Sequence, residues 1–309
     1  MNLSSPKISI DNRLLAIEEL FRQRKNKIAI TELSKLNESD FQTKDYELGF
    51  YLSLRADGYY IESKYKQALE NGLRAVKILA QSSLNKQYGR IQLVLSKIYS
   101  ALGNLRNAEI RARDALAAYR RCMDEVGQLD SLNELARIGY IRCNYQDAIS
   151  FLEEALSMVT TNPRKRAQLT GNLGRIRVHL GDWQQAERDL VETLEYNKQH
   201  NEEISQAINT LSLGFLQIRQ RKFILASRSL DNALEIISRL GLKREKVIYL
   251  EYAGELALEK GDIYKAKAIL NNAYEKGMLM APDSALVSQS VRRLAEVELL
   301  LDNIDEAMK

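Results

Sequence analysis

The sequence predicts an all-α fold, a solenoid of about eight antiparallel helix hairpins. Its 309 residues include only three prolines, so long stretches of the chain contain no residue that must break a helix. Strong helix formers dominate the composition, and the alternation expected of strands does not occur at useful length. Seven alanines recur at spacings of 40, 40, 38, 40, 40 and 41 residues, and such a period indicates stacked repeats. They are Ala68, Ala108, Ala148, Ala186, Ala226, Ala266 and Ala307.

A helix boundary is expected five residues before each alanine. Three copies carry a glycine, then Asn or Asp, then a bulky apolar residue: Gly103-Asn104-Leu105, Gly181-Asp182-Trp183 and Gly261-Asp262-Ile263. The glycine can take the left-handed conformation that ends one helix, and the Asn or Asp can cap the next. The other copies lose the glycine but keep the apolar residue; they begin at Ser63, Cys143, Arg221 and Asp302.

Small residues mark where helices are expected to cross. One lies twelve positions before every repeated alanine, and in most copies another follows seven positions after it. Small side chains let two backbones approach closely, so we place the crossing of the two helices of each hairpin at the first set. That set is Ala56, Ser96, Ala136, Gly174, Gly214, Gly254 and Ala295.

This register resembles the tetratricopeptide repeat, whose pattern is Leu-Gly on the first helix and an Ala with an aromatic shortly before it on the second. The resemblance covers residues 41 to 309, and a degenerate copy around Ala29 extends it to about residue 10. The match is close at Leu173-Gly174, Trp183 and Ala186, and again at Leu213-Gly214, Phe223 and Ala226.

The resemblance implies a right-handed superhelical solenoid whose first helices line a concave surface. The unit of about 40 residues is longer than the usual unit of about 34. In this it resembles the regulatory arrays of bacterial signalling and transcription proteins. Armadillo and related repeats share the period but not the glycine, Asn or Asp, apolar turn. They are the alternative fold.

We predict a single domain over 1–309, with a degenerate first hairpin and an incomplete last one. Only Met308 and Lys309 follow Ala307, so a capping helix is expected elsewhere. The chain is interpreted as a truncated piece of a longer protein; the alternatives are cover by a second chain or self-association through the uncapped hairpin. The predicted hairpins span 10–37, 41–81, 86–122, 125–160, 164–200, 202–240, 243–279 and 283–309.

Composition argues against several functional classes. A net charge of +4 is too small and too dispersed for direct nucleic-acid binding. Two cysteines and the absence of an apolar secretion segment indicate a reducing cytoplasm, and no apolar run is long enough to span a membrane. His179 and His200 lack partners at metal-ligand spacing, and no catalytic constellation is found, so we expect neither an enzyme nor a bound cofactor.

The concave face is the expected place of function. In the resembling family, the residue after each small residue of the first helices points into the groove, which here gives a basic centre at Lys97, Arg137 and Arg175 and acidic residues at Glu255 and Glu296. Three cations beside amides could hold a peptide carboxylate or an acidic side chain; alternatively, they pair internally with Glu134 or Asp130. The predicted partner-binding residues are Lys97, Asn133, Arg137, Tyr140, Asn172, Arg175 and Phe215.

The leading functional hypothesis is a protein- or peptide-binding scaffold. It would serve as the regulatory or sensory region of a larger cytoplasmic signalling or transcription-regulating protein. A stand-alone receptor for a short peptide or small molecule is the first alternative, and a passive assembly scaffold is the second.

Overall fold

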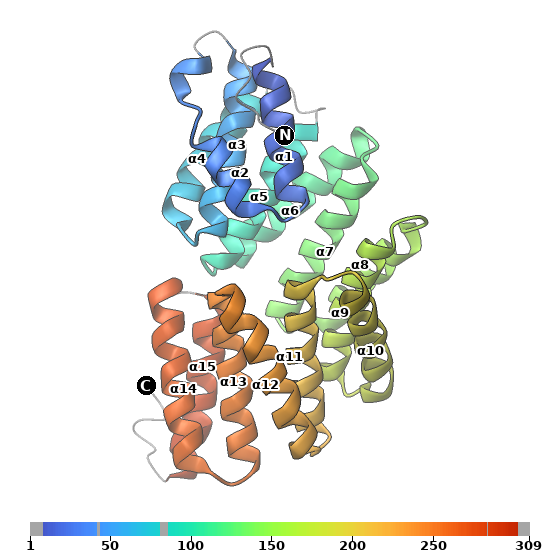
Figure 1. Cartoon of the computed structure of the whole chain (residues 1–309), viewed down its shortest axis with the longest axis vertical. Helices are drawn as coiled ribbons and strands as arrows, with labels where there is room; N and C mark the ends of the chain where they lie inside the picture. The colour runs from blue at the N-terminus through green and yellow to red at the C-terminus, as the bar shows by residue number, and fades with distance from the viewer. Residues whose placement is uncertain (1–8, 42–43, 81–85, 283, 302–309) are drawn as a thin grey trace. The chain divides into compact units, whose positions relative to one another are not determined.

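The computed structural model describes residues 9–41, 44–80, 86–282 and 284–301, and it is helical with no strand across these ranges (Figure 1). The predicted all-α class and helical-hairpin solenoid are confirmed. The elements are α1 (Ile10–Arg22), α2 (Asn26–Leu33), the short 3-10 helix η1 (Glu38–Phe41), α3 (Asp45–Ile61), α4 (Tyr65–Leu79), α5 (Lys86–Ala101), α6 (Leu105–Arg121), α7 (Glu125–Ile141), α8 (Tyr145–Met158), α9 (Pro163–Leu180), α10 (Trp183–Gln199), α11 (Glu203–Arg219), α12 (Phe223–Leu240), α13 (Lys243–Glu259), α14 (Ile263–Met280) and α15 (Ala285–Leu300).

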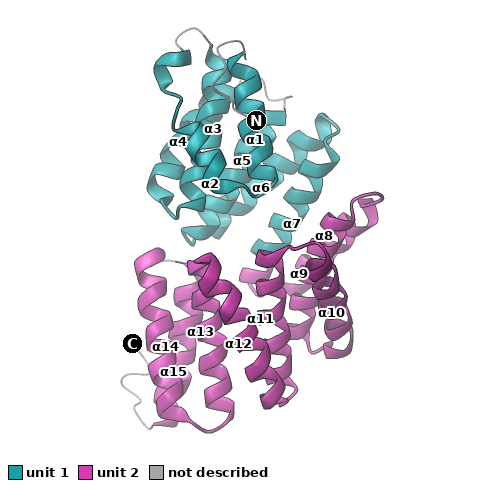
Figure 2. Cartoon of the chain, in the orientation of Figure 1, with its two compact units in different colours: residues 1–138 teal, residues 139–309 magenta. Residues whose placement is uncertain are grey.

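The chain forms two compact units, residues 1–138 and residues 139–309 (Figure 2). The boundary falls inside α7, after Ile138. The single domain over 1–309 and the hairpin limits given above stay predictions. Three expected features fall outside the described residues: the turn at Asp302, the repeat alanine Ala307, and the interface of the uncapped hairpin.

In the first unit, α1 pairs with α2, α3 with α4, and α5 with α6, while α3 also contacts the first helices on either side of it, α1 and α5. One continuous hydrophobic core joins α1 to α5, and its largest fully buried side chains include Phe41, Phe50 and Leu54. The 3-10 turn contributes Phe41, whose ring stacks on Tyr51 of α3 with centroids 4.8 Å apart. The segment that follows α2 is thereby fixed against α3.

In the second unit, α9 pairs with α10, α11 with α12, and α13 with α14, and α14 packs on α15. The first helices α9, α11, α13 and α15 also contact one another in that order and form one layer of the unit.

The repeat alanines lie where paired helices meet. All six within the described residues, Ala68, Ala108, Ala148, Ala186, Ala226 and Ala266, are fully buried.

The turns inside the hairpins share one backbone conformation whether or not they carry glycine. Gly103, Gly181 and Gly261 have φ values of 77°, 83° and 81°, as the sequence predicts. In Cys143-Asn144, the Cys143 amide donates to the Tyr140 carbonyl and the Asn144 amide donates to the Gly139 carbonyl, which is the bonding of a helix end that closes on a left-handed residue. The same left-handed φ occurs at the non-glycine positions Ser63 (60°), Cys143 (58°) and Arg221 (59°).

Capping by the next residue is confirmed in two of the three glycine turns. The side chains of Asn104 and Asp262 accept hydrogen bonds from the amides of Asn107 (3.2 Å) and Lys265 (3.4 Å). Asp182 makes no such bond; its carboxylate lies 3.9 Å from Arg177 Nε instead.

The first-helix glycines lie against the second helix of the same hairpin. A Cβ built on Gly254 would come within 2.6 Å of Leu270 Cγ, and one built on Gly174 within 2.9 Å of Asp189 Cβ. Carbon atoms prefer separations of about 3.5 to 4.0 Å, so these positions exclude any side chain unless the helices separate. The close crossing expected from the small residues is therefore present here.

Candidate functional site

The predicted site residues fall in both units, and those of the first unit surround a buried carboxylate. The Arg137 guanidinium of α7 donates to both carboxylate oxygens of Glu134, from Nη2 to Oε1 at 2.5 Å and from Nε to Oε2 at 2.9 Å. Asn133 lies half-buried beside Glu134 on the same helix. The hydroxyl of Ser96 on α5 also donates to Glu134, at 3.4 Å. Arg137 is thus paired within its own helix.

Lys97, half-buried on α5, faces the same acidic group. Burial by itself lowers the pKa of the Lys97 ammonium, but the nearby carboxylates of Asp57, Asp130 and Glu134 outweigh it and raise the pKa above its ordinary value. Lys97 therefore stays charged. Its charge lies among three carboxylates, which is the internal arrangement weighed as the alternative to a ligand site.

Asp57 of α3, one of the three carboxylates near Lys97, is itself bound by an arginine. Arg90 donates to Asp57 Oδ2 at 2.6 Å and to the Ser53 hydroxyl at 3.1 Å, and its Nε lies 3.5 Å from Glu18 Oε1. Arg90 and Glu18 are both buried. This part of the first unit is a network of buried charges that compensate one another.

The predicted site residues of the second unit centre on His179 of α9. The Tyr140 hydroxyl and His179 Nε2 share a hydrogen bond of 2.9 Å, and the imidazole lies between aromatic rings. Its centroid is 5.2 Å from that of Tyr140, 5.4 Å from that of Tyr145 and 5.0 Å from that of Phe215. Phe215 stacks in turn on Tyr252 of α13, with centroids 4.7 Å apart. We call Tyr140, Tyr145, His179, Phe215 and Tyr252 the aromatic stripe.

Arg175 and Asn172 lie beside the aromatic stripe on α9. The Arg175 guanidinium is 5.2 Å from the centroid of the Tyr140 ring, within the range of a cation–π contact, and its Nη2 donates to Asn172 Oδ1 at 3.2 Å. Both side chains are half-buried. A cation, an amide and an aromatic ring therefore meet on the layer of first helices.

Phe215 occupies a different environment from the open groove that its register predicts. Its side chain is only 5% exposed, because His179 covers one side of the ring and Tyr252 the other. It packs with Val178 and Leu190 in a hydrophobic core cluster. Phe215 therefore packs inside the aromatic stripe and offers no exposed ring face to a partner.

The His179 imidazole is neutral near neutral pH. Burial lowers its pKa to about 4, and the positive charge of Arg175 acts in the same direction. This half-buried imidazole lies against tyrosine and phenylalanine rings and packs as an aromatic side chain with one hydrogen bond. Across the described residues, no group of three His, Cys, Asp or Glu side chains is arranged to hold a metal ion.

Glu251 and Glu255, the acidic residues of α13, are buried and partnered. Glu255 accepts from Arg293 of α15 at 2.6 Å, and Arg219 of α11 lies 3.6 Å away. Glu251 accepts from the Ser290 hydroxyl at 3.0 Å, and burial raises the pKa of the Glu251 carboxyl to about 8. Glu251 is therefore largely protonated near pH 7, so this residue adds little negative charge to the acidic residues of α13.

Fixed-register reasoning missed Tyr145, Tyr252, Arg293 and Ser290. Each lies on a helix next to a predicted site residue, but at a different distance from the small residue of its helix. The signal available was the recurrence of an aromatic residue or histidine within five residues of the small residue on α7, α9, α11 and α13, which the reading of one position per helix could not detect.

Comparison with known proteins was informative only at the level of structure. No protein-family model matches the sequence, and no curated protein matches it. The Rap conjugation gene regulator of the plasmid pLS20, in complex with the Phr* peptide, superposes with a TM-score of 0.70 at 16% identity, covering 91% of this chain and 80% of that chain. The apo quorum sensor NprR from B. thuringiensis gives a TM-score of 0.64 at 18% identity, covering 96% of this chain and 83% of that one.

A third solved structure, aspartyl phosphate phosphatase F from Bacillus subtilis, gives a TM-score of 0.66 at 15% identity, covering 98% of this chain and 82% of that one. The fold is that of tetratricopeptide-type repeats. The repeat resemblance found in the sequence is thereby confirmed. At these identities the likeness establishes the fold alone, and the function of this repeat chain is argued from its own residues.

Proposed function

We propose that this chain is a peptide-binding regulatory protein. The observation that carries the proposal is the meeting of Arg175, Asn172 and the Tyr140 ring on the layer of first helices in the second unit. A guanidinium binds a carboxylate in a bidentate manner, and an amide can both donate to and accept from a peptide backbone. Two of the structural neighbours support it, since one is a complex with the Phr* peptide and the other is a quorum sensor.

The seven predicted residues are assigned different roles under this proposal. Asn172 and Arg175 contact the peptide in the second unit, and Lys97 and Asn133 are proposed separately as partner contacts of the first unit. Arg137 holds Glu134 beside Lys97, while Tyr140 and Phe215 support Arg175 and His179 from below. The partner is a protein or peptide with a free carboxylate or an acidic side chain, because the contacting groups are cations and amides.

The biological setting is proposed at two levels. A cytoplasmic regulatory region of a larger signalling or transcription protein and a stand-alone receptor for a short peptide both agree with the fold, and a passive scaffold is the remaining candidate. We propose a binding function and no catalytic activity, although one structural neighbour is a phosphatase. No described helix combines the length and apolar character needed to cross a membrane.

Capture from a random pool of synthetic pentapeptides tests the proposal. The immobilised chain is incubated with one pool that has free C-terminal carboxylates and with a matched amidated pool, and the retained peptides are identified by mass spectrometry. The proposal expects a small set of related sequences, retained from the free-acid pool and depleted by Arg175→Glu. Retention of no peptide from either pool, or of the same peptides by Arg175→Glu, would contradict it. Unequal recovery from the two pools identifies the carboxylate as the recognised group.

A further inference from the structure

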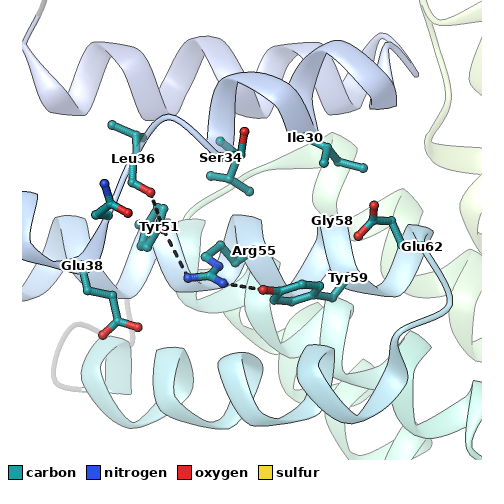
Figure 3. A pocket seen from close by; sticks show the side chains of 11 residues that line it. Ile30, Ser34, Leu36, Glu38, Tyr51, Arg55, Gly58, Tyr59 and Glu62 are labelled. Atoms are coloured by element: carbon teal, nitrogen blue, oxygen red, sulfur yellow. Dashed lines mark hydrogen bonds between the residues drawn. The ribbon is translucent and has the colours of Figure 1, made fainter.

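A pocket of about 330 Å³ lies in the first unit, where the end of α2 and the segment after it face α3 (Figure 3). Its volume is at the lower end of the range of about 300 to 1,000 Å³ typical of small-molecule sites. Ile30, Leu33 and Leu36 form an apolar part, and Arg55 with Tyr51 and Tyr59 forms a polar part on one helix. All of these residues belong to the first unit, and none of them is among the residues assigned above to partner binding.

Arg55 is held in the pocket by two neutral groups. Its Nη1 donates to the Tyr51 hydroxyl at 3.4 Å, and its Nη2 donates to the Tyr59 hydroxyl. The Tyr51 hydroxyl donates its own proton to the Leu36 carbonyl at 2.8 Å, so its oxygen is oriented to accept from Arg55. Within the described parts of the chain, Arg55 forms no ion pair with an Asp or Glu. A guanidinium has five N–H donors, so Arg55 retains donors for a ligand.

The two carboxylates at the pocket are compensated by cations that do not line it. Glu38 is bound by both terminal nitrogens of Arg74, at 2.9 Å and 2.6 Å, and Glu62 lies 3.0 Å from Lys64 Nζ. Arg55 is therefore the cation of this site without a carboxylate at ion-pair distance, although its charge helps to lower the pKa of the Glu38 carboxyl. Because Glu38 and Glu62 still repel a second negative charge, a monoanion fits better than a doubly charged phosphate.

We propose that this pocket binds a small carboxylate with an apolar body. The carboxylate accepts N–H bonds from Arg55 and the O–H bond of Tyr59, and the apolar body packs on Ile30, Leu33 and Leu36. Such a group is carried either by a free organic acid or by the C-terminal residue of a peptide. The site differs from the proposed peptide site of the second unit in its residues, so the two can fail independently.

The test uses three acids and their amides as probes. Hexanoate and benzoate represent free organic acids, N-acetyl-leucine represents a peptide C-terminus, and hexanamide, benzamide and N-acetyl-leucinamide are the uncharged controls. Binding to the full chain is measured by ligand-observed NMR titration. We expect at least one acid to bind about tenfold or more tightly than its amide, because charge-assisted hydrogen bonds are lost in the amide. The acid preferred over its amide tells which source the pocket recognises.

Variants locate the binding. Arg55→Gln and Tyr59→Phe should each weaken acid binding, Arg55→Gln by about tenfold or more, and leave amide binding unchanged. Arg113→Gln changes an exposed arginine of α6 in the same unit; it is the matched control and should bind like the wild type. If Arg55→Gln does not fold, Tyr59→Phe decides the assignment. Equal binding of all three acids and their amides, or undiminished acid binding in the folded pocket variants, would overturn the proposal.

Discussion

The close crossing of α13 and α14 predicts that Gly254→Ala destabilises the second unit. The new Cβ would lie 2.6 Å from Leu270 Cγ and 2.7 Å from Leu270 Cδ2, and Leu270 is fully buried in the core. Relieving such an overlap requires Leu270 to leave its rotamer or the helices to separate, which costs about 1 to 3 kcal/mol. Alanine favours the helix over glycine by about 1 kcal/mol. The expected net change is therefore a loss of about 0 to 2 kcal/mol, with no net gain.

Gly58→Ala in α3 is the matched control, and the sign should reverse. A Cβ there would meet Ile30 Cγ1 at 3.6 Å and Phe21 Cζ at 3.8 Å, which are ordinary contacts. Only the gain in helix propensity remains, so this variant should be about 1 kcal/mol more stable. Both effects are measured as local opening free energies by native-state hydrogen exchange, for the amides of α13–α14 and of α3 respectively.

The reasoning is refuted if Gly254→Ala raises the opening free energy of α13–α14 as much as Gly58→Ala raises that of α3. Such a result would mean that the first-helix glycines are tolerated only as poor helix formers, and that close helix approach is not what places them at this register.

Three further predictions concern the turns, the pH dependence and the repeat alanine. Cys143→Gly and Arg221→Gly should each raise the free energy of unfolding in urea by about 1 kcal/mol, because both positions have left-handed φ values that cost a side chain about that much. Stability of the second unit should fall as the pH rises from about 4.5 towards 8, since the folded state holds the Glu251 proton more tightly than the unfolded chain, and Glu251→Gln should abolish this fall within the same pH window. Ala186→Leu should lower the free energy of unfolding, measured by thermal melting, by about 1 to 3 kcal/mol, because Ala186 is fully buried at a helix crossing.

The hairpin register was predictable from sequence because it depends on steric rules with strong residue preferences. A left-handed helix end favours glycine, and a close crossing favours Gly, Ala or Ser, so a repeat of both fixes the phase of every hairpin. The turns at Ser63 and Arg221 show that the conformation outlasts the glycine. Neighbouring repeats impose the left-handed turn at these two positions, and only the copies with glycine make that turn predictable from sequence.

The composition of the aromatic stripe could not be predicted by reading one position per helix. Tyr140 lies four residues after Ala136 and His179 five after Gly174, whereas Phe215 lies one residue after Gly214 and Tyr252 two before Gly254. The contacts keep nearly the same level from α7 to α9 and then move back by about one helical turn on α11 and again on α13, so they form a diagonal over the last three helices. The angle between neighbouring hairpins sets that diagonal, and this angle depends on packing that no single repeat encodes.

Charge pairing was the second feature beyond the reach of sequence. The basic centre was identified from Lys97, Arg137 and Arg175, but Glu134 lies three residues before Arg137 on the same helix and binds it. Deciding between that pair and a ligand requires side-chain geometry. The pocket at Arg55 was missed for a similar reason, because it depends on the segment after α2, which belongs to the degenerate first repeat.

Calorimetric titration of the captured pentapeptide against Arg175→Glu and Arg228→Glu tests the central claim most directly. Arg175 lies on the first-helix layer of the second unit, whereas Arg228 is exposed on the second helix α12, so both variants reverse one charge but only one changes the proposed site. With the helical circular-dichroism signal unchanged in both, we predict that Arg175→Glu weakens binding by about tenfold or more, as expected for one lost charge-assisted hydrogen bond. Arg228→Glu should bind like the wild type. Equal affinities for the two variants would contradict a peptide site at Arg175.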